Sequence, residues 1–211
     1  YKKNNYDDVI NTAKEAIEKH PFSPRLFYLK GLAHMNKQEY AKALQDLKDG
    51  RDLVFDNHNL KSEFHALLGD VYHNLNNNKM SDESYSLALE YNNNNTFVLN
   101  NYSYYLALRG ENLNMALEMI IRCNDLTQDT PNASFLDTYA WVLYKLEKYD
   151  LALKQIEKAL KLNPESGVLY DHYGDILYEL GDIKSAIVQW KKALVIDGDN
   201  KHLEDKIHKY E

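Results

Sequence analysis

The histidines at positions 65 and 73 are the first candidates for chemistry in this chain. They lie eight residues apart on one predicted helix. At that distance they need a third ligand to hold a metal ion together. We therefore interpret both as ordinary helix histidines and predict no metal site.

A single cysteine and one acidic turn are further candidates. Cys123 falls where the pattern described below requires a small buried side chain, so we expect an inert thiol. One cysteine also excludes an internal disulfide and a cysteine-based zinc site. Asp197-Gly198-Asp199-Asn200 is similar to the start of a calcium loop, but the glycine and glutamate that such a loop needs are not at the required spacing. We interpret it as a turn between helices.

Asp137, Asp171 and Asp175 would be the best carriers of acid–base catalysis. Their spacing is equally what a solvated helix face produces. The sequence contains no Gly-rich phosphate loop, no His-Glu-x-x-His motif and no nucleophile elbow. We predict that the chain is not an enzyme, with no catalytic residue and no cofactor.

The composition of the chain argues against nucleic acid and against a membrane span. The chain has 211 residues, with 32 Asp and Glu against 25 Lys and Arg. Nucleic acid is bound by clustered Lys and Arg, and no such cluster is present. No apolar run approaches the roughly 20 residues of a membrane-spanning helix. We therefore expect a protein or peptide partner, no nucleic acid and no membrane span.

The elements that position these side chains repeat every 34 residues. The recurring pairs are Ala140 and Gly174, Leu143 and Leu177, Ala152 and Ala186, Ile156 and Trp190, and Ala159 and Ala193. A period of this size is typical of stacked helix pairs, in which each unit buries its apolar face against its neighbours. The small residues allow two helices to approach closely, and we expect the alanines at 152, 159, 186 and 193 to be buried.

Each unit is predicted to contain a first helix, a short turn and a second helix. Gly181 is placed for a left-handed turn residue, and Asn163-Pro164 ends a second helix. We expect the extra residues near 57–61, 109–113 and 131 to lie in loops. The predicted units are a lone second helix at 1–23, full repeats at 24–61, 62–95, 96–132, 133–166 and 167–200, and a capping helix at 201–211. We expect the partner of the lone helix upstream of residue 1.

This pattern resembles the tetratricopeptide repeat over almost the whole chain. The family's small position in the first helix falls on Gly31, Gly69, Ser103, Ala140 and Gly174. Its small position opening the second helix falls on Ala43, Ser81, Ala116, Ala152 and Ala186. The resemblance implies an all-α fold, a right-handed α-solenoid of helix–turn–helix units with a C-terminal capping helix. It also implies a protein-interaction scaffold, or alternatively the regulatory or targeting arm of a larger enzyme or assembly factor.

In this family the first helices line the concave face, where ligands usually lie. Carried over by position, the residues of this first-helix face are Tyr28, Asp70, His73, Asn100, Tyr104, Asp137, Trp141, Tyr144, Asp171, Asp175 and Tyr178. Their rings offer stacking area, and we expect their carboxylates to favour a basic partner. The segments 99–106 and 136–144 look like a bacterial subgroup of these proteins. That likeness favours the periplasm or cell envelope over the cytoplasm.

Overall fold

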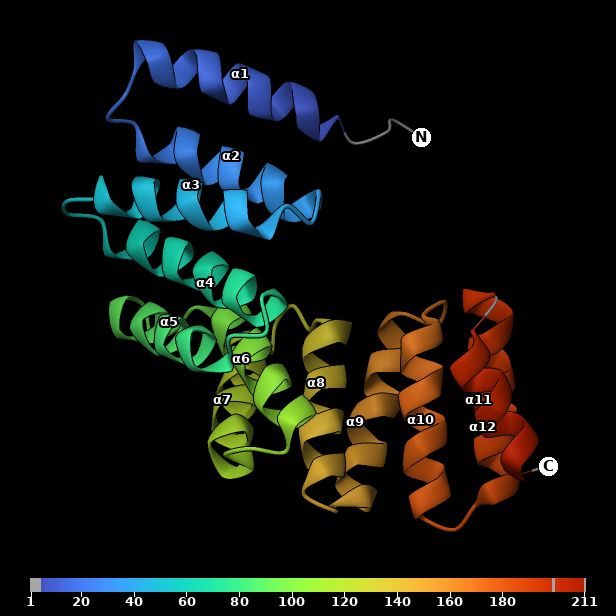
Figure 1. The fold of residues 1–211 in the computed structure, drawn as a ribbon. Coiled ribbons are helices and arrows are strands. Elements are labelled where there is room, and N and C mark those ends of the chain that lie inside the picture. The colour runs from blue at the N-terminus through green and yellow to red at the C-terminus, as the bar shows by residue number, and fades with distance from the viewer. Residues whose placement is uncertain (1–4, 199, 211) are drawn as a thin grey trace. The chain divides into compact units, whose positions relative to one another are not determined.

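The computed structural model describes residues 5–198 and 200–210, which form helices joined by short turns, with no strand among them (Figure 1). The predicted all-α class is confirmed. The helices are α1 (Tyr6–Lys19), α2 (Pro24–Asn36), α3 (Tyr40–Asp52), α4 (His58–Asn74), α5 (Asn78–Tyr91), α6 (Thr96–Arg109), α7 (Leu113–Leu126), α8 (Ala133–Lys145), α9 (Tyr149–Leu162), α10 (Gly167–Glu179), α11 (Ile183–Asp197) and α12 (Lys201–Tyr210).

The chain divides into two compact units, an N-terminal unit that ends at Val98 and a C-terminal unit that begins at Leu99. In the N-terminal unit, α2 packs on α3 and α4 packs on α5 as helix pairs. In the C-terminal unit, α8 pairs with α9 and α10 with α11, and α12 packs on α11 (Figure 1). Successive pairs within each unit are also in contact, through α3 and α4 in the N-terminal unit and through α9 and α10 in the C-terminal unit. Each pair therefore covers part of its neighbour.

The pairs are held together by small residues that face large ones. A Cβ atom on Gly174 would lie 2.4 Å from Cδ1 of Trp190, and one on Gly69 would lie 2.7 Å from a ring carbon of Tyr85. Real Cβ atoms do not approach other atoms so closely. Glycine is therefore required where the first helix of these pairs crosses the ring of the second.

The second helices use alanine in the same way. Ala152, Ala159, Ala186 and Ala193 are all 0% exposed, which confirms the burial predicted from the repeat. Ala152 and Ala159 belong to one buried cluster between neighbouring helices, and Ala186 and Ala193 belong to the next.

We expect Ala186→Leu to destabilise the protein by about 1–3 kcal/mol, because the added atoms overpack a closed helix crossing. The free energy of unfolding in urea measures this. Val188→Leu is the matched control in α11, since Val188 is 49% exposed. Equal midpoints for the two variants would contradict the packing register.

One or two positions after each first helix ends, the turn to its second helix contains a left-handed residue. These residues are Gln38, Asn76, Gly110, Glu147 and Gly181, with φ of 60°, 58°, 70°, 59° and 85°. Gly181 confirms the left-handed turn predicted there. Gln38 and Glu147 have the same left-handed backbone, although Gln and Glu rarely adopt it. The turn between the two helices therefore imposes this conformation whatever the residue.

The extra residues near 57–61 are not in a loop, so that prediction is wrong. Helix α4 begins at His58 and has 17 residues, against 13 in α2 and α8. The side chain of Asn57 accepts a hydrogen bond from the Leu60 amide at 2.9 Å, and Leu60 is buried. A capped start and an apolar anchor therefore extend the helix by about one turn. The other insertions do lie between helices, at 110–112 and 127–132.

The two ends of the chain differ in burial. In α12, Leu203 and Ile207 are buried against Trp190 and Ala193 of α11, so this helix covers the apolar face of the last pair. Residue 211 of the predicted capping helix lies outside the described residues, as does Asp199 of the acidic turn. In α1, Ala13 is the buried residue of the helix.

Candidate functional site

The first-helix face of the C-terminal unit is bound together by pairs of residues 35 positions apart. Three pairs join one first helix to the next or to the capping helix: Asp137 with His172 at 2.7 Å, Tyr144 with Glu179 at 3.4 Å, and Asp171 with Lys206 at 2.7 Å. The first and second join α8 to α10, and the third joins α10 to α12. The repeat thus places equivalent faces of successive first helices side by side.

Trp141 is the centre of an aromatic cluster on this face. Its ring stacks on Tyr144 at 4.8 Å and on His172 at 4.3 Å, with interplanar angles of 8° and 19°. The Lys145 ammonium lies 4.8 Å from the centre of the indole. The indole Nε1 is buried and has no hydrogen-bond acceptor among the described residues. A half-buried ring system therefore contains one unsatisfied donor.

The Asp137–His172 pair carries a charge into this cluster. Burial lowers the pKa of His172, but the hydrogen bond to Asp137 and the nearby carboxylates of Asp171 and Asp175 outweigh it, so the pKa is raised overall. The imidazolium form is therefore retained to a higher pH than in free histidine. The charge of Asp137 is correspondingly balanced within the chain.

Lys206 of the capping helix pairs with the next two carboxylates. Its Nζ lies 2.7 Å from Asp171 and 2.6 Å from Asp175, and Asp175 also accepts a hydrogen bond from Trp190 Nε1 at 2.9 Å. Burial lowers the pKa of Lys206, but the hydrogen bonds to Asp171 and Asp175 and the charges of these carboxylates together raise it by more than burial lowers it. The pKa of Lys206 is therefore raised overall. This single lysine supplies one positive charge to two carboxylates, so the expectation that these aspartates favour a basic partner stays a prediction.

The other predicted residues of the C-terminal unit are half-buried. Asn100 donates a hydrogen bond to Asn101 at 3.1 Å, and the Tyr104 ring lies 5.7 Å from that of Tyr105. Tyr178 packs 4.6 Å from Tyr210 of the capping helix. Tyr178 therefore contributes to the docking of α12.

In the N-terminal unit, two of the predicted residues have packing roles. Tyr28 meets the core residue Phe64 edge-on at 5.4 Å, and burial raises the pKa of its hydroxyl. Asp70 accepts a hydrogen bond from the hydroxyl of buried Tyr85. His73 is half-buried on the same helix as Asp70. The stacked rings around Trp141 and its unpaired Nε1 therefore belong to the C-terminal unit.

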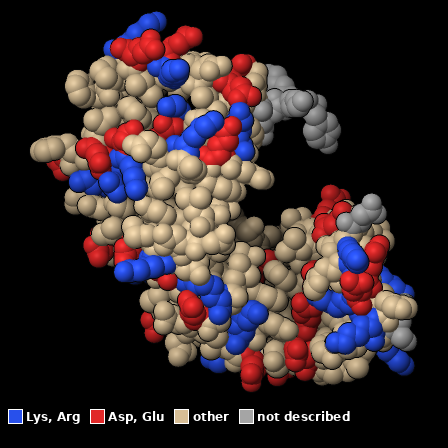
Figure 2. All heavy atoms as spheres, viewed as in Figure 1, with Lys and Arg blue, Asp and Glu red and all other residues tan. Residues whose placement is uncertain are grey.

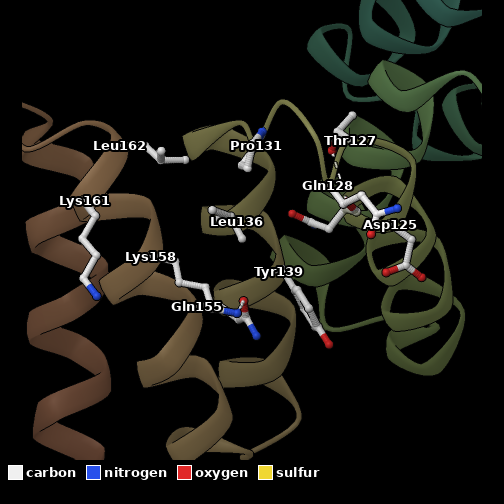
Figure 3. Close-up of a pocket in the computed structure, with 11 residues that line it drawn as sticks. Asp125, Thr127, Gln128, Pro131, Leu136, Tyr139, Gln155, Lys158, Lys161 and Leu162 are labelled. Atoms are coloured by element: carbon white, nitrogen blue, oxygen red, sulfur yellow. Dashed lines mark hydrogen bonds between the residues drawn. The ribbon is translucent and has the colours of Figure 1, made fainter.

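Sequence reasoning missed several residues. His172 and Lys206 complete the charge pairs of the first-helix face, and the signal that could have found them is their spacing of 35 residues from Asp137 and Asp171. It also missed a cavity of about 440 Å³ between α7, α8 and α9 (Figure 3). Leu136 and Tyr139 of α8 line this cavity.

His65 lies in a smaller groove of the N-terminal unit. Its ring stacks on Tyr91 at 5.6 Å, and Arg51 and Lys61 also line the groove. Burial, followed by the charges of Arg51 and Lys61, lowers the pKa of His65 to about 4. The neutral imidazole is therefore the form that suits the folded state.

We expect this histidine to weaken the fold in mild acid. The unfolded state takes up the proton near pH ~6.5, whereas the folded state resists it down to about pH 4. Stability is thus fully present above the unfolded pKa and is lost as the pH falls through this window. His65→Phe keeps the ring without the titration. The difference in unfolding free energy between the two proteins should change between neutral and mildly acidic pH, and a constant difference would contradict the assignment.

The described residues provide neither a metal-binding cluster nor a membrane-spanning helix. No group of three or more His, Cys, Asp or Glu side chains that could hold a metal ion is found among them. None of the described helices is long and apolar enough to cross a membrane.

Stacked antiparallel helix pairs with a 34-residue repeat define a helix–turn–helix repeat protein. Family models described as tetratricopeptide repeat match residues 1–52, 62–95 and 133–166, together more than half of the chain. The chain belongs to the tetratricopeptide repeat family. Proteins of this family stack their repeats into extended surfaces that bind other proteins.

Solved structures of low sequence identity share this fold. The APC/C hetero-tetramer Cut9–Hcn1 matches with a TM-score of 0.86 and 14% identity, over 98% of this chain and 40% of that one. Pseudomonas aeruginosa PilF matches with 0.69 and 18%, over 98% and 90%. PilW, a type IV pilus biogenesis factor, matches with 0.78 and 19%, over 89% and 85%. The chain thus spans less than half of the Cut9–Hcn1 chain it matches. No curated protein sequence matches it significantly.

Proposed function

We propose that this chain is a non-catalytic scaffold that binds a peptide or protein segment on its first-helix face, with the cluster around Trp141 as the anchor. The observation that carries the proposal is the buried Nε1 of Trp141, which has no acceptor among the described residues. Native structures rarely leave a buried donor unpaired. A ligand carbonyl would satisfy it.

The chemistry of the anchor indicates what kind of segment it binds. Tyr144, His172 and Trp141 present stacked rings, and Lys145 covers the indole with a flexible side chain that a ligand can displace. Stacked rings favour an aromatic or aliphatic side chain, and the indole N–H favours a backbone carbonyl. Asp137 is paired with His172, and Asp171 and Asp175 share Lys206, so the anchor on Trp141 does not depend on a basic residue in the segment.

The test begins with a partner captured on the immobilised chain and identified by mass spectrometry. Its affinity is then measured for the wild type, for Trp141→Ala and for Lys154→Ala, which changes an exposed residue of α9 away from the ring cluster. We expect Trp141→Ala to weaken binding by about 2 kcal/mol, as for an interface hot spot. Lys154→Ala should leave the affinity unchanged. Loss of affinity in Lys154→Ala alone would place the partner elsewhere and contradict the proposal.

A further inference from the structure

A cavity in the C-terminal unit lies on a different side of α8 from the Trp141 cluster. It has a volume of about 440 Å³, within the range of ligand pockets. Figure 3 shows Lys158, Lys161 and Leu162 of α9 on one side, Asp125 and Gln128 on the other, and Leu136 and Tyr139 of α8 between them. At roughly 100° per residue, Leu136 and Tyr139 lie on another face of α8 than Trp141.

The cavity is apolar with one cationic wall. Leu136, Leu162, Pro131 and the ring of Tyr139 supply the apolar lining. Lys158 contacts the amide oxygen of Gln155 at 3.4 Å, and neither Lys158 nor Lys161 has a carboxylate partner among the described residues. The opposite wall carries Asp125. Burial, followed by the charge of this carboxylate, raises the pKa of the Tyr139 hydroxyl. A ligand carboxylate is therefore attracted to the α9 side.

A related cavity lies one repeat later in the chain. A second cavity of about 340 Å³ is lined by Pro164, Tyr170, Lys191, Lys192, Val195 and Ile196. Tyr170, Lys192 and Ile196 follow Leu136, Lys158 and Leu162 by 34 residues each. The Lys192 ammonium lies 5.3 Å from the centre of the Tyr170 ring. These two cavities, hereafter called grooves, lie one repeat apart in the same unit. They suit a polypeptide segment whose side chains recur along its length.

The rims of both grooves expose apolar side chains. Leu162 is 49% exposed and Val195 is 84% exposed, and each stands beside a groove lysine. In a chain with a formal net charge of −7, groove lysines beside exposed apolar residues define a local cationic and apolar surface. Its complement carries apolar and acidic side chains.

We propose that these two grooves form a second interaction surface, which binds an acidic and apolar segment of a partner protein. The apolar side chains of the segment enter the grooves, and its Asp or Glu residues pair with Lys158, Lys161 and Lys192. The surface is separate from the first-helix face and needs no ligand there.

Fluorescence anisotropy with labelled synthetic peptides tests this surface. The probe carries two Leu-Phe-Glu-Glu blocks, one control peptide replaces Glu by Lys, and another replaces Leu and Phe by Ser. We expect the probe to bind at least about tenfold more tightly than either control, a difference of ~1.4 kcal/mol. Lys158→Glu and Leu162→Lys should each weaken binding of the probe. Both residues are exposed, so the fold is retained.

Lys184→Glu is the matched control, since Lys184 is exposed in the first turn of α11 and lines neither groove. It should leave affinity for the probe unchanged, as should Trp141→Ala. Failure of the probe to bind, or an equal loss in Lys184→Glu and Lys158→Glu, overturns the proposal. Binding of dodecanoate in place of the probe also overturns it and assigns the cavity to a small carboxylic acid.

Discussion

Trp190→Ala is expected to destabilise the protein by about 3–5 kcal/mol, the range for removing a buried tryptophan side chain. Trp190 is 1% exposed and lies at the junction of α10, α11 and α12. It fills the space that Gly174 leaves, donates a hydrogen bond to Asp175 and packs against Tyr178 and Tyr210. Removing the indole opens a cavity and also removes the hydrogen-bond donor of the Asp175 carboxylate. Chemical denaturation followed by circular dichroism measures the loss.

A double-mutant cycle separates this packing from general damage. In the wild type, Gly174→Ala should destabilise, because the new Cβ would lie 2.4 Å from the indole. With Trp190→Leu present, the same change should become favourable by up to ~1 kcal/mol, the helix propensity gained by replacing glycine. If Gly174→Ala has the same sign in both backgrounds, the two residues do not oppose each other as described.

Lys206→Met is expected to cost about 2–4 kcal/mol, because it leaves two neighbouring carboxylates without their cation. Lys206 bonds both Asp171 and Asp175 and lies 5.2 Å from the centre of the Trp190 ring. Methionine retains the apolar stem, so the change reports mainly on the charge. We expect α12 to exchange its amide protons faster in this variant, since this lysine ties it to α10.

The matched control removes the repulsion as well as the cation. Adding Asp171→Asn and Asp175→Asn to Lys206→Met should restore part of the lost stability, while the amide oxygen introduced by Asp175→Asn can still accept the hydrogen bond of Trp190. A triple variant less stable than Lys206→Met would show that the lysine acts through packing of its stem. Lys201→Met, at an exposed position of the same helix, should be within about 0.5 kcal/mol of the wild type.

The repeat predicted much of the fold because the same small and large residues must meet in every pair. Ala186 and Ala193 could be placed in the core from spacing alone, and both are fully buried. The start of α4 could not, because extra residues between repeats fit a loop or a helix equally well. The side chain of Asn57 caps the helix and Leu60 is buried, and these two contacts make the extra residues helical. The turns were predicted, but the left-handed backbone of Gln38 and Glu147 within them was not, because Gln and Glu seldom adopt it.

The candidate site was harder to predict than the fold. Family position put Trp141 and Asp171 on the first-helix face, but side-chain pairing between repeats depends on a spacing of 35, one residue beyond the period. Lys206 was assigned to a capping helix, and its contact with Asp171 gave no signal within that helix. The cavity beside Lys158 required three helices to be placed together, which no single periodic pattern describes.

The pairing of His172 and Lys206 with acidic neighbours has a consequence for ionic strength. Figure 2 shows Lys and Arg side chains interspersed with Asp and Glu side chains on the face in view. Dissolved salt screens charges that face water over a Debye length of about 8 Å at physiological concentration, and it acts far less on pairs that are partly buried. A partner anchored on Trp141 should therefore stay bound when the column is washed with concentrated sodium chloride. A partner seated beside Lys158 and Lys161 should be released by the same wash, so that one salt gradient separates the occupants of the two surfaces.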